Sequence, residues 1–487
     1  MKSNRYTCID IGSYEIKLLV CILREERLFV LTQKSIKSMG IECGQITNFD
    51  KLVNQIKKIK ELAELDLKQP LENLILTVSP ISVLVESITG KINLDVNQPV
   101  NSGDIRQLFR QVMTQPHSET HLLVGLVPRL FKIDENHIQN PCGLSGMNLE
   151  VEAGRILMPT TTVSNLVHVV ESSGFKVDEI IVGSISEALL ALETPEMYAR
   201  TCHINVGHSL TTLTVIHDGK ILHARSLPVG GRDITCAIAE KFNISEARAN
   251  ELKVSYGKVL IDTTEKGDHQ VIYFDDSQED VVFITRGMLN KVVTEWTFKL
   301  FETVTDHIVE DLRLREKDYH YRLTGGMAEL PHILHALQHQ LPVPVSLYRP
   351  SMLGVRDTKF SSLVCVAIFA HELNLLLDAS SAADVEQAAV VETKKEMTPQ
   401  IEHILPMVHA KSNAPQLIKG EMTEITPLSE DTDKTVSVLG KFDEPPLRDE
   451  RTSITDDYMD QKLGNSGVLV KFLDKIFNEN EEETFNN

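Results

Sequence analysis

The chain has 487 residues, a hydrophobic fraction of 42% and a formal net charge of −20 at pH 7. This length exceeds what one hydrophobic core supports, so we expect two lobes with appendages. The acidic balance argues against general nucleic-acid binding, which needs a basic face.

The seven cysteines form no CxxC pair, which favours a reduced, cytosolic protein. Residues 1–5 lead straight into a strand-like run without the apolar stretch of a signal peptide. The chain has no apolar run of the roughly 18 residues that a spanning helix needs, so we expect no membrane span.

The first part of the chain predicts a meander of strands followed by a helix. Runs over 6–9, 15–23 and 28–33 have the pattern of strands, and 54–65 has the spacing of a helix. Residues of about 85–155 contain many turn-forming Pro and Gly residues among strand-like segments, which indicates an inserted module.

The second half begins in the same way. Strand patterns return over 201–227, with a hairpin turn at 217–220. We therefore expect a second lobe that opens as the first does. From about 378 to 463 the periodicity is lost and polar and charged residues dominate, which predicts a disordered linker.

Two short glycine turns, far apart in the chain, are the main functional signal. Cys8–Ser13 (CIDIGS) and Leu323–Met327 (LTGGM) each follow an apolar strand-like run. Neither has a GxGxxG or GxxxxGK pattern, so Rossmann and P-loop sites are unsupported. A tight turn after Asp10 presents backbone N–H groups to an anion, and Gly325-Gly326 lets a second backbone segment approach a flat ligand. The implied ligand is a nucleotide held between two lobes.

Side-chain alternation adds detail to the first turn. In a strand that leaves the turn, Glu15 and Lys17 share a face with Ser13, so Lys17 is able to reach a phosphate, while Tyr14 falls on the opposite, apolar face. Asp10, at the strand end, is suited to hold Mg²⁺ through water. Glu15 is an awkward charge beside phosphates, and a plain hairpin with a capping Asp remains the alternative for this segment alone.

A matching strand, turn and strand occurs at 205–212 (NVGHSLTT). Its backbone is able to close on the phosphates from the other side, so that the nucleotide state would bias lobe closure. His208 is either a phosphate donor or a solvated turn histidine, and Asn205 cannot serve as a carboxylate base. We assign no catalytic residue.

The order of these motifs resembles the actin/Hsp70/sugar-kinase ATPase superfamily and, within it, the bacterial cell-division family FtsA. The segments that carry the resemblance are Ile9–Ser13, Ser38–Gly44, Pro141–Gly146, Asn205–Gly207, Pro228–Thr235, Ala249–Gly257 and Leu323–Gly326. Each motif is weak alone, and their shared order and spacing over nearly residues 1–375 carry the resemblance.

The resemblance implies an α/β fold of two actin-like lobes with a small subdomain inserted in the first, followed by a disordered linker and a C-terminal amphipathic helix. The connecting helix would include Ser186–Ala188. The expected parts are a first lobe over 1–84 and 166–200, an inserted subdomain over 85–165, a second lobe over 201–377, a linker over 378–463, and a membrane-targeting helix with an acidic tail over 464–487.

Carried over position by position, the resemblance implies ATP and Mg²⁺ as ligands, with Asp10 as the metal residue. The nucleotide-binding residues that it implies are Asp10, Gly12, Ser13, Tyr14, Lys17, Gly207, His208, Ser209, Gly231, Glu251, Lys253, Gly325, Gly326 and Met327.

This chain departs from the family pattern at several of these positions. Asn205 stands where the family usually has Asp, His208 where it has Gly, and Glu15 where it has Lys. A further Asp expected near Ala237 is missing, so we expect ATP binding with at most slow hydrolysis. Lys17 instead has a spacing similar to that of the phosphate lysine of actin.

The family also tends to carry an Arg in the helix expected over 289–305, in the subdomain that contacts the tubulin-like protein FtsZ. Trp296 holds that place here. Trp296 and Lys299 are therefore the candidate partner-binding residues, although a tryptophan on a helix with Phe298 and Phe301 is also explained by packing alone.

The C-terminal segment 466–478 has an amphipathic helical pattern. A helix of this length is about 20 Å long, too short to span a bilayer but able to lie in its interface. Docking on the protein's own surface or on a partner is the alternative. The expected membrane-binding residues are Val468, Leu469, Lys471, Phe472, Leu473, Lys475, Ile476 and Phe477.

We therefore expect an ATP-binding cell-division protein on the cytoplasmic face of the cell membrane at the division site. It would polymerise and tether FtsZ filaments to anionic lipid, contact other division-site membrane proteins, and bind no nucleic acid. The alternatives are an FtsA-like or pilus-assembly-type actin homologue with another scaffold role, a small-molecule kinase of the same superfamily, and an Hsp70-like chaperone. The kinase reading lacks a carboxylate at 205, and the chaperone reading lacks a strand-rich peptide-binding module after the ATPase.

Overall fold

The computed structural model describes residues 5–24, 27–138, 140–192, 200–261, 268–275, 282–341, 343–349 and 358–378. All of these residues fall within one compact unit. The expected linker and amphipathic helix, from residue 379 onward, lie outside the described residues.

The first lobe is built on a five-stranded sheet with the strand order β11-β6-β1-β2-β3. Its first three strands, β1 (Arg5–Ile11), β2 (Glu15–Arg24) and β3 (Arg27–Lys37), form an antiparallel meander. β6 (Asn73–Val78) and β11 (Lys176–Val182) then add in parallel. The predicted strands are confirmed here, each longer than the sequence pattern indicated.

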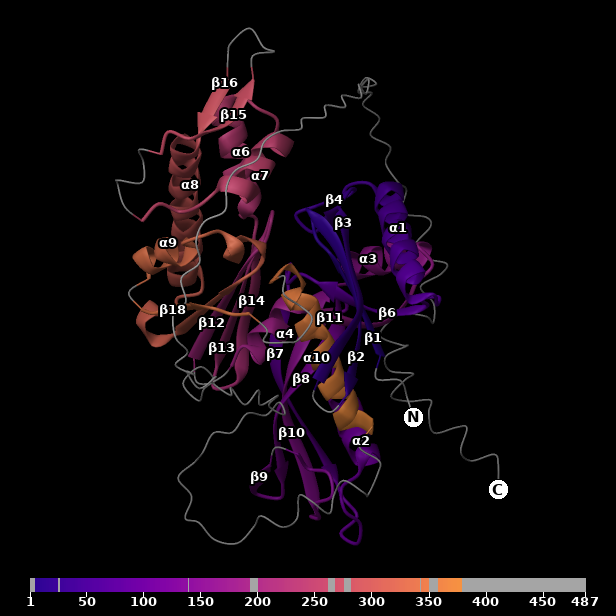
Figure 1. Cartoon of the computed structure of the whole chain (residues 1–487). Helices are drawn as coiled ribbons and strands as arrows, with labels where there is room; N and C mark the ends of the chain where they lie inside the picture. The colour runs from indigo at the N-terminus through magenta and orange to yellow at the C-terminus, as the bar shows by residue number, and fades with distance from the viewer. Residues whose placement is uncertain are drawn as a thin grey trace, which may run out of the picture. The chain divides into compact units, whose positions relative to one another are not determined.

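Helices pack against this sheet (Figure 1). They are α1 (Phe49–Leu67), α3 (Thr160–Ser172), α4 (Gly183–Leu190) and the last described helix, α10 (Ser361–Asp378). α1 begins where the Asn48 side chain accepts a hydrogen bond from the Lys51 N–H, and it buries a stripe of apolar residues against the lobe. A small hairpin of β4 (Ile41–Glu42) and β5 (Gln45–Ile46) precedes it.

The second lobe repeats the topology of the first. β12 (Arg200–Val206), β13 (Thr211–His217) and β14 (Lys220–Leu227) form an antiparallel meander, and β17 (His320–Thr324) and β18 (Val345–Leu347) add in parallel, in the order β14-β13-β12-β17-β18. The expectation that the second lobe opens as the first does is confirmed.

The helices of the second lobe lie between its strands in the chain. They are α6 (Gly231–Phe242), α7 (Glu246–Tyr256), α8 (Arg286–Asp306) and α9 (Ile333–Gln340). β15 (Val271–Asp275) and β16 (Val282–Thr285) form a separate hairpin. A π-helical turn follows α8 at His307–Asp311, and short 3₁₀ turns occur at Glu316–Asp318, Gly326–Glu329 and Thr358–Phe360.

The inserted subdomain has a four-stranded antiparallel sheet of its own, in the order β7-β10-β8-β9. Its elements are β7 (Leu84–Asn93), α2 (Ser102–Met113), β8 (His121–Ile133), β9 (Asn136–Ile138) and β10 (Asn148–Pro159). α2 starts with a reciprocal capping box between Asn101 and Asp104 and packs its apolar face on the sheet, which gives the subdomain a separate core.

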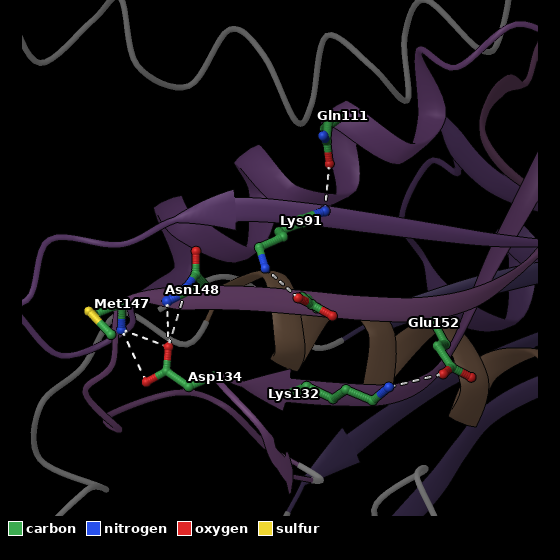
Figure 2. Close-up of polar contacts among 8 residues, drawn as sticks. Lys91, Gln111, Lys132, Asp134, Met147, Asn148 and Glu152 are labelled. Atoms are coloured by element: carbon green, nitrogen blue, oxygen red, sulfur yellow. Dashed lines mark hydrogen bonds and ion pairs between the residues drawn. The ribbon is translucent and has the colours of Figure 1, made fainter.

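The other face of this sheet carries ion pairs (Figure 2). Lys91 on β7 pairs with Glu150 on β10 at 2.7 Å, and Lys132 on β8 lies 3.4 Å from Glu152. At the β8–β9 turn the Asp134 carboxylate accepts hydrogen bonds from the backbone N–H groups of Met147 and Asn148. Ion pairs between neighbouring strands therefore stabilise this face, and the Asp134 carboxylate stabilises the turn. Apolar side chains packed on α2 stabilise the opposite face.

The fold class expected from the sequence is confirmed: two actin-like α/β lobes, with a small subdomain inserted in the first. Among the described helices, none is long and apolar enough to cross a membrane. All seven cysteines are free thiols.

Candidate functional site

Two equivalent turns define the candidate site, one between β1 and β2 and the other between β12 and β13. In the first, the Gly12 N–H donates to the carbonyl of Glu15 at 3.2 Å, and in the second the Gly207 N–H donates to the carbonyl of Leu210 at 2.9 Å. A Cβ on Gly12 would lie 3.0 Å from the Glu15 carbonyl oxygen, and a Cβ on Gly207 would lie 2.9 Å from the Leu210 carbonyl oxygen. The two glycines therefore make the same tight turn in both lobes.

The strands leading into these turns place matching side chains opposite each other. Asp10 pairs with Lys17 across β1 and β2, and the corresponding pair across β12 and β13 is Asn205 with Thr212. The Lys17 ammonium lies 2.8 Å from the Asp10 carboxylate. Burial is the largest single effect and would lower the pKa of Lys17, but the charges of Asp10, Glu15 and Glu187 together with the Asp10 hydrogen bond raise the pKa overall. The predicted phosphate lysine and the predicted metal residue are thus brought together.

Two other predictions for the first turn need correction. Tyr14 does not follow Ile16 and Leu18 into the core, because it lies in the turn itself and its side chain is exposed. Glu15 does not stand uncompensated near the site, since its carboxylate lies 3.8 Å from the Lys359 ammonium.

The second turn carries buried hydroxyls without partners. In the part of the chain that the structure describes, the Ser209 Oγ and the Thr212 Oγ1 are buried and have no hydrogen-bond partner. Buried polar groups are normally satisfied, so unpaired hydroxyls beside a glycine turn are what an anion ligand would complete.

A third group of residues comes from α6, α7 and the loop after β17. The Lys253 ammonium donates to the Gly231 carbonyl at 2.6 Å and to the Thr235 hydroxyl at 2.7 Å. Burial lowers the pKa of Lys253 to about 8. A Cβ on Gly231 would lie 2.7 Å from the Met327 sulfur and 3.3 Å from the Lys253 ammonium, so Gly231 lies beside both of these side chains.

The late glycine pair has two different roles. Gly325 has φ +94°, and a Cβ there would lie 2.5 Å from both the Asn205 amide oxygen and the Val206 carbonyl. A Cβ on Gly326 would meet nothing within 4 Å. Gly325 is therefore fixed by the fold, whereas Gly326 borders open space.

Glu251 is placed apart from these residues. Its carboxylate pairs with Arg248 at 2.6 Å and its side chain is exposed. Asn250 and Lys253, one helical turn apart, face Thr235 instead, since the Thr235 hydroxyl lies 3.4 Å from the Asn250 amide oxygen. Asn250 is not among the predicted site residues, although its three-residue spacing from Lys253 places both on one face of the helix.

The sequence places Glu187 only within the expected connecting helix. It lies on α4, fully buried, and accepts a hydrogen bond of 2.6 Å from the Asn205 side-chain amide. Burial raises the pKa of Glu187 to about 7, a shift that the Asn205 bond and the Lys17 charge oppose. No local pattern marks it, because its burial depends on strands from both lobes.

The candidate partner residues lie on α8. Trp296 is partly buried against the core of the second lobe, and the Lys299 ammonium lies 4.5 Å from the centre of its ring. Lys299 also pairs with Glu295 at 2.9 Å. Trp296 is therefore in contact both with the core of the second lobe and with the Lys299 ammonium.

Comparisons with known proteins agree with this architecture. The family model described as "Cell division protein FtsA" matches residues 202–365, and "SHS2 domain inserted in FTSA" matches residues 82–157, which is the inserted subdomain.

The chain is also similar to curated relatives. The cell division protein FtsA of Bacillus subtilis (strain 168) is 25% identical over 387 residues, which covers 76% of this chain and 84% of the relative. That of Enterococcus hirae is 24% identical over 375 residues, covering 77% and 84%.

The similarity to solved structures is weaker. The PilM-PilN type IV pilus biogenesis complex gives a TM-score of 0.47 at 16% identity, over 75% of this chain and 98% of that one. MreB5 of Spiroplasma citri bound to ADP gives a TM-score of 0.45 at 12% sequence identity, and the match covers 76% of this chain and 98% of that one. The family models thus match the second lobe and the insert, and the FtsA relatives cover about three quarters of the chain, so the chain is similar to the FtsA cell-division proteins over most of its length.

Proposed function

We propose that this protein binds ATP between its two lobes, polymerises on the cytoplasmic face of the membrane, and tethers FtsZ filaments there through its C-terminal amphipathic segment. The observation that carries the nucleotide part is the pair of equivalent glycine turns, Gly12 and Gly207, with the unpaired Ser209 and Thr212 hydroxyls beside the second.

The residues present fit a nucleotide. The two turns and the Ser209 and Thr212 hydroxyls would hold phosphates, and Lys17 adds positive charge. Asp10 would hold Mg²⁺ through water, which matches the preference of that ion for few carboxylates and retained hydration. When bound, Mg²⁺-ATP supplies a charged bridge between the lobes.

The nucleoside side of the site is assigned to the second lobe. Gly231 lies beside both Lys253 and Met327, and a Cβ on Gly326 would meet open space. Glu251 belongs to this group by resemblance, and it would have to leave Arg248 to reach a ligand.

Hydrolysis is at most slow in this proposal. Asn205 presents an amide where a family carboxylate is usual, and that amide already donates to Glu187. An amide cannot accept a proton as a general base. The nucleotide would then act through lobe closure and filament assembly.

The tether is supported by the sequence of 466–478, with an apolar face and lysines on the other. One such helix binds weakly, since each lysine adds about 1 kcal/mol at an anionic surface, so filament formation would supply avidity. We assign the FtsZ contact to α8 around Trp296 and Lys299, and expect further contacts with other division-site membrane proteins.

Co-sedimentation with vesicles of anionic phospholipid, with and without Mg²⁺-ATP, tests the tether. The full chain should pellet with lipid, while a truncation ending at Asn465 and the variant Phe472→Glu should stay in solution. Asn478→Glu, which adds the same charge on the polar face, is the matched control and should still pellet. Equal behaviour of the full chain and both disrupted variants would remove the tether from the proposal.

A further inference from the structure

The tips of the two glycine turns touch each other through their side chains. Tyr14 comes from the turn between β1 and β2, and His208 from the turn between β12 and β13. Their ring centroids lie 4.8 Å apart at an interplanar angle of 37°. The contact therefore joins the first lobe to the second at the turns themselves.

Both rings are carried on fixed backbone. The Tyr14 carbonyl accepts a hydrogen bond from the Ser38 N–H at 2.8 Å, and the His208 carbonyl accepts from the Arg232 N–H at 2.7 Å. A Cβ on Gly230 would lie 2.6 Å from the His208 carbonyl oxygen, so the start of α6 packs directly on the second turn. These backbone contacts hold Tyr14 in the first lobe and His208 in the second, and so fix the position of the stacked pair.

Asn250 adds a second link across the lobes. Its amide nitrogen donates to the Tyr14 hydroxyl at 3.0 Å, while its amide oxygen lies 3.4 Å from the Thr235 hydroxyl. Thr235 in turn accepts from Lys253 at 2.7 Å. A continuous polar chain thus runs from Lys253, which contacts Gly231, to the aromatic pair.

The protonation state of the His208 imidazole favours its contact with the Tyr14 ring. Burial, together with the nearby Lys253 and Arg232 charges, lowers the pKa of His208 to about 4. The imidazole is therefore uncharged at neutral pH and packs on Tyr14 as a neutral ring. Arg232 makes its own link across the lobes through an ion pair with Glu42.

We propose that Tyr14, His208 and Asn250 form a clasp between the two lobes that holds the phosphate turns together and slows the release of nucleotide. This inference rests on the proposed function, because it concerns how the same site retains its ligand. The clasp also explains why a histidine stands at position 208, because a glycine there would have no side chain to pack on Tyr14 of the first lobe.

The test follows dissociation of mant-ATP with Mg²⁺ from the full chain by stopped-flow fluorescence, with unlabelled ATP as the chase. His208→Gly and Tyr14→Ala should each release the probe roughly 3- to 10-fold faster, the range expected for one aromatic pair. The double variant should be no faster than Tyr14→Ala alone, because Tyr14→Ala already removes the contact with His208. Tyr14→Phe keeps the ring and loses only the Asn250 bond, so it should fall between.

A second readout needs no nucleotide. In the free protein, backbone hydrogen exchange of residues 205–211 should rise in Tyr14→Ala and stay unchanged in Phe29→Ala, which truncates an exposed aromatic elsewhere on the first lobe. This readout also reports whether each variant is folded.

The outcomes separate the two claims. If the unaltered protein binds no mant-ATP, the proposed function fails and the exchange data alone decide whether the clasp exists. If release rates and exchange are both unchanged in His208→Gly and Tyr14→Ala, the clasp is overturned. It is also overturned if His208→Gly retains the probe longer, since the pair would then obstruct the ligand.

Discussion

Asn205 donates a 2.6 Å hydrogen bond from its side-chain amide to the carboxylate of Glu187, and the bond joins β12 of the second lobe to the connecting helix α4. Glu187 is fully buried, and this burial raises its pKa to about 7. The contact places a proton-holding carboxyl group near Asp10 and Lys17, whose charges act on it.

The Glu187 carboxyl should make stability depend on pH. Its folded-state pKa of about 7 lies above the ordinary value of 4.5, so the folded protein binds the proton more tightly than the unfolded chain. The contribution is therefore complete below about pH 4.5 and is lost as the pH rises through about 7, with a total of about 3 kcal/mol at most.

Glu187→Gln should flatten this dependence between pH 5 and 8, measured as the midpoint of thermal unfolding. Glu251→Gln, at an exposed position, is the control and should keep the slope of the unaltered protein. A slope that survives Glu187→Gln would assign the titration to another group.

The unpaired hydroxyl of Thr212 should matter for ligand binding more than for folding. Thr212→Val keeps the shape of the side chain and removes a buried hydroxyl that has no partner in the described structure, so the free energy of unfolding should not fall. ATP affinity should weaken by about 5- to 10-fold, the loss of roughly one hydrogen bond.

Isothermal titration calorimetry and thermal unfolding of the full chain measure the two effects. Thr214→Val is the matched control, because its hydroxyl donates to the Ser184 carbonyl at 3.3 Å in the free protein. That variant should lose stability and keep its affinity. The reverse pattern at these two threonines would contradict the assignment of the second turn to phosphates.

The two neighbouring glycines after β17 should respond differently to the same change. Gly325→Ala forces a Cβ into a left-handed backbone position and against the Asn205 side chain and the Val206 carbonyl, so it should cost about 2 kcal/mol or more of folding stability. The methyl group of Gly326→Ala enters open space, so the free energy of unfolding of this variant should lie within about 0.5 kcal/mol of that of the unaltered protein.

The affinity for ATP separates function from folding in this pair. Gly326→Ala should bind Mg²⁺-ATP at least several-fold more weakly, because the added methyl group occupies the space assigned to the nucleoside. If Gly326→Ala binds as the unaltered protein does, the nucleoside does not approach this glycine.

In the inserted subdomain, Asp134 should be a local stability determinant. Asp134→Ala removes the acceptor for the Met147 and Asn148 N–H groups and leaves alanine at φ +54°, so it should destabilise the subdomain by about 1–3 kcal/mol. Asp134→Asn keeps an acceptor and tolerates the conformation, and it should cost much less.

Hydrogen exchange over 130–150 measures this effect locally. Glu135→Ala, at the next and exposed position, should leave the exchange unchanged. Destabilisation by both the Ala and the Asn variant to the same degree would show that the negative charge, and not the acceptor geometry, holds the loop.

Much of the fold could be predicted from the sequence because its signals are local. The alternation of β1 to β3 and its repetition in β12 to β14 follow from apolar periodicity and turn residues, and both meanders are confirmed. The turn glycines Gly12 and Gly207 can also be predicted, since each turn is formed by a few residues that are neighbours in the sequence.

The rest of the site depends on contacts between distant segments. Glu187 is buried on α4, which contacts strands of both lobes. Glu15 lies beside Lys359, and Tyr14 leaves the expected apolar face and packs on His208. None of these partners is a neighbour in sequence, so periodicity does not report them. The turn position of Tyr14 overrides strand alternation, because alternation begins only at Glu15.

The most direct test of the tether is flotation of anionic phospholipid vesicles with purified FtsZ, the full chain and Mg²⁺-ATP. The account predicts that FtsZ floats with the vesicles only when the full chain is present, and that the truncation ending at Asn465 leaves FtsZ at the bottom of the gradient. If the full chain floats with the vesicles while FtsZ remains at the bottom, the protein binds the membrane without tethering FtsZ, and the central claim is contradicted.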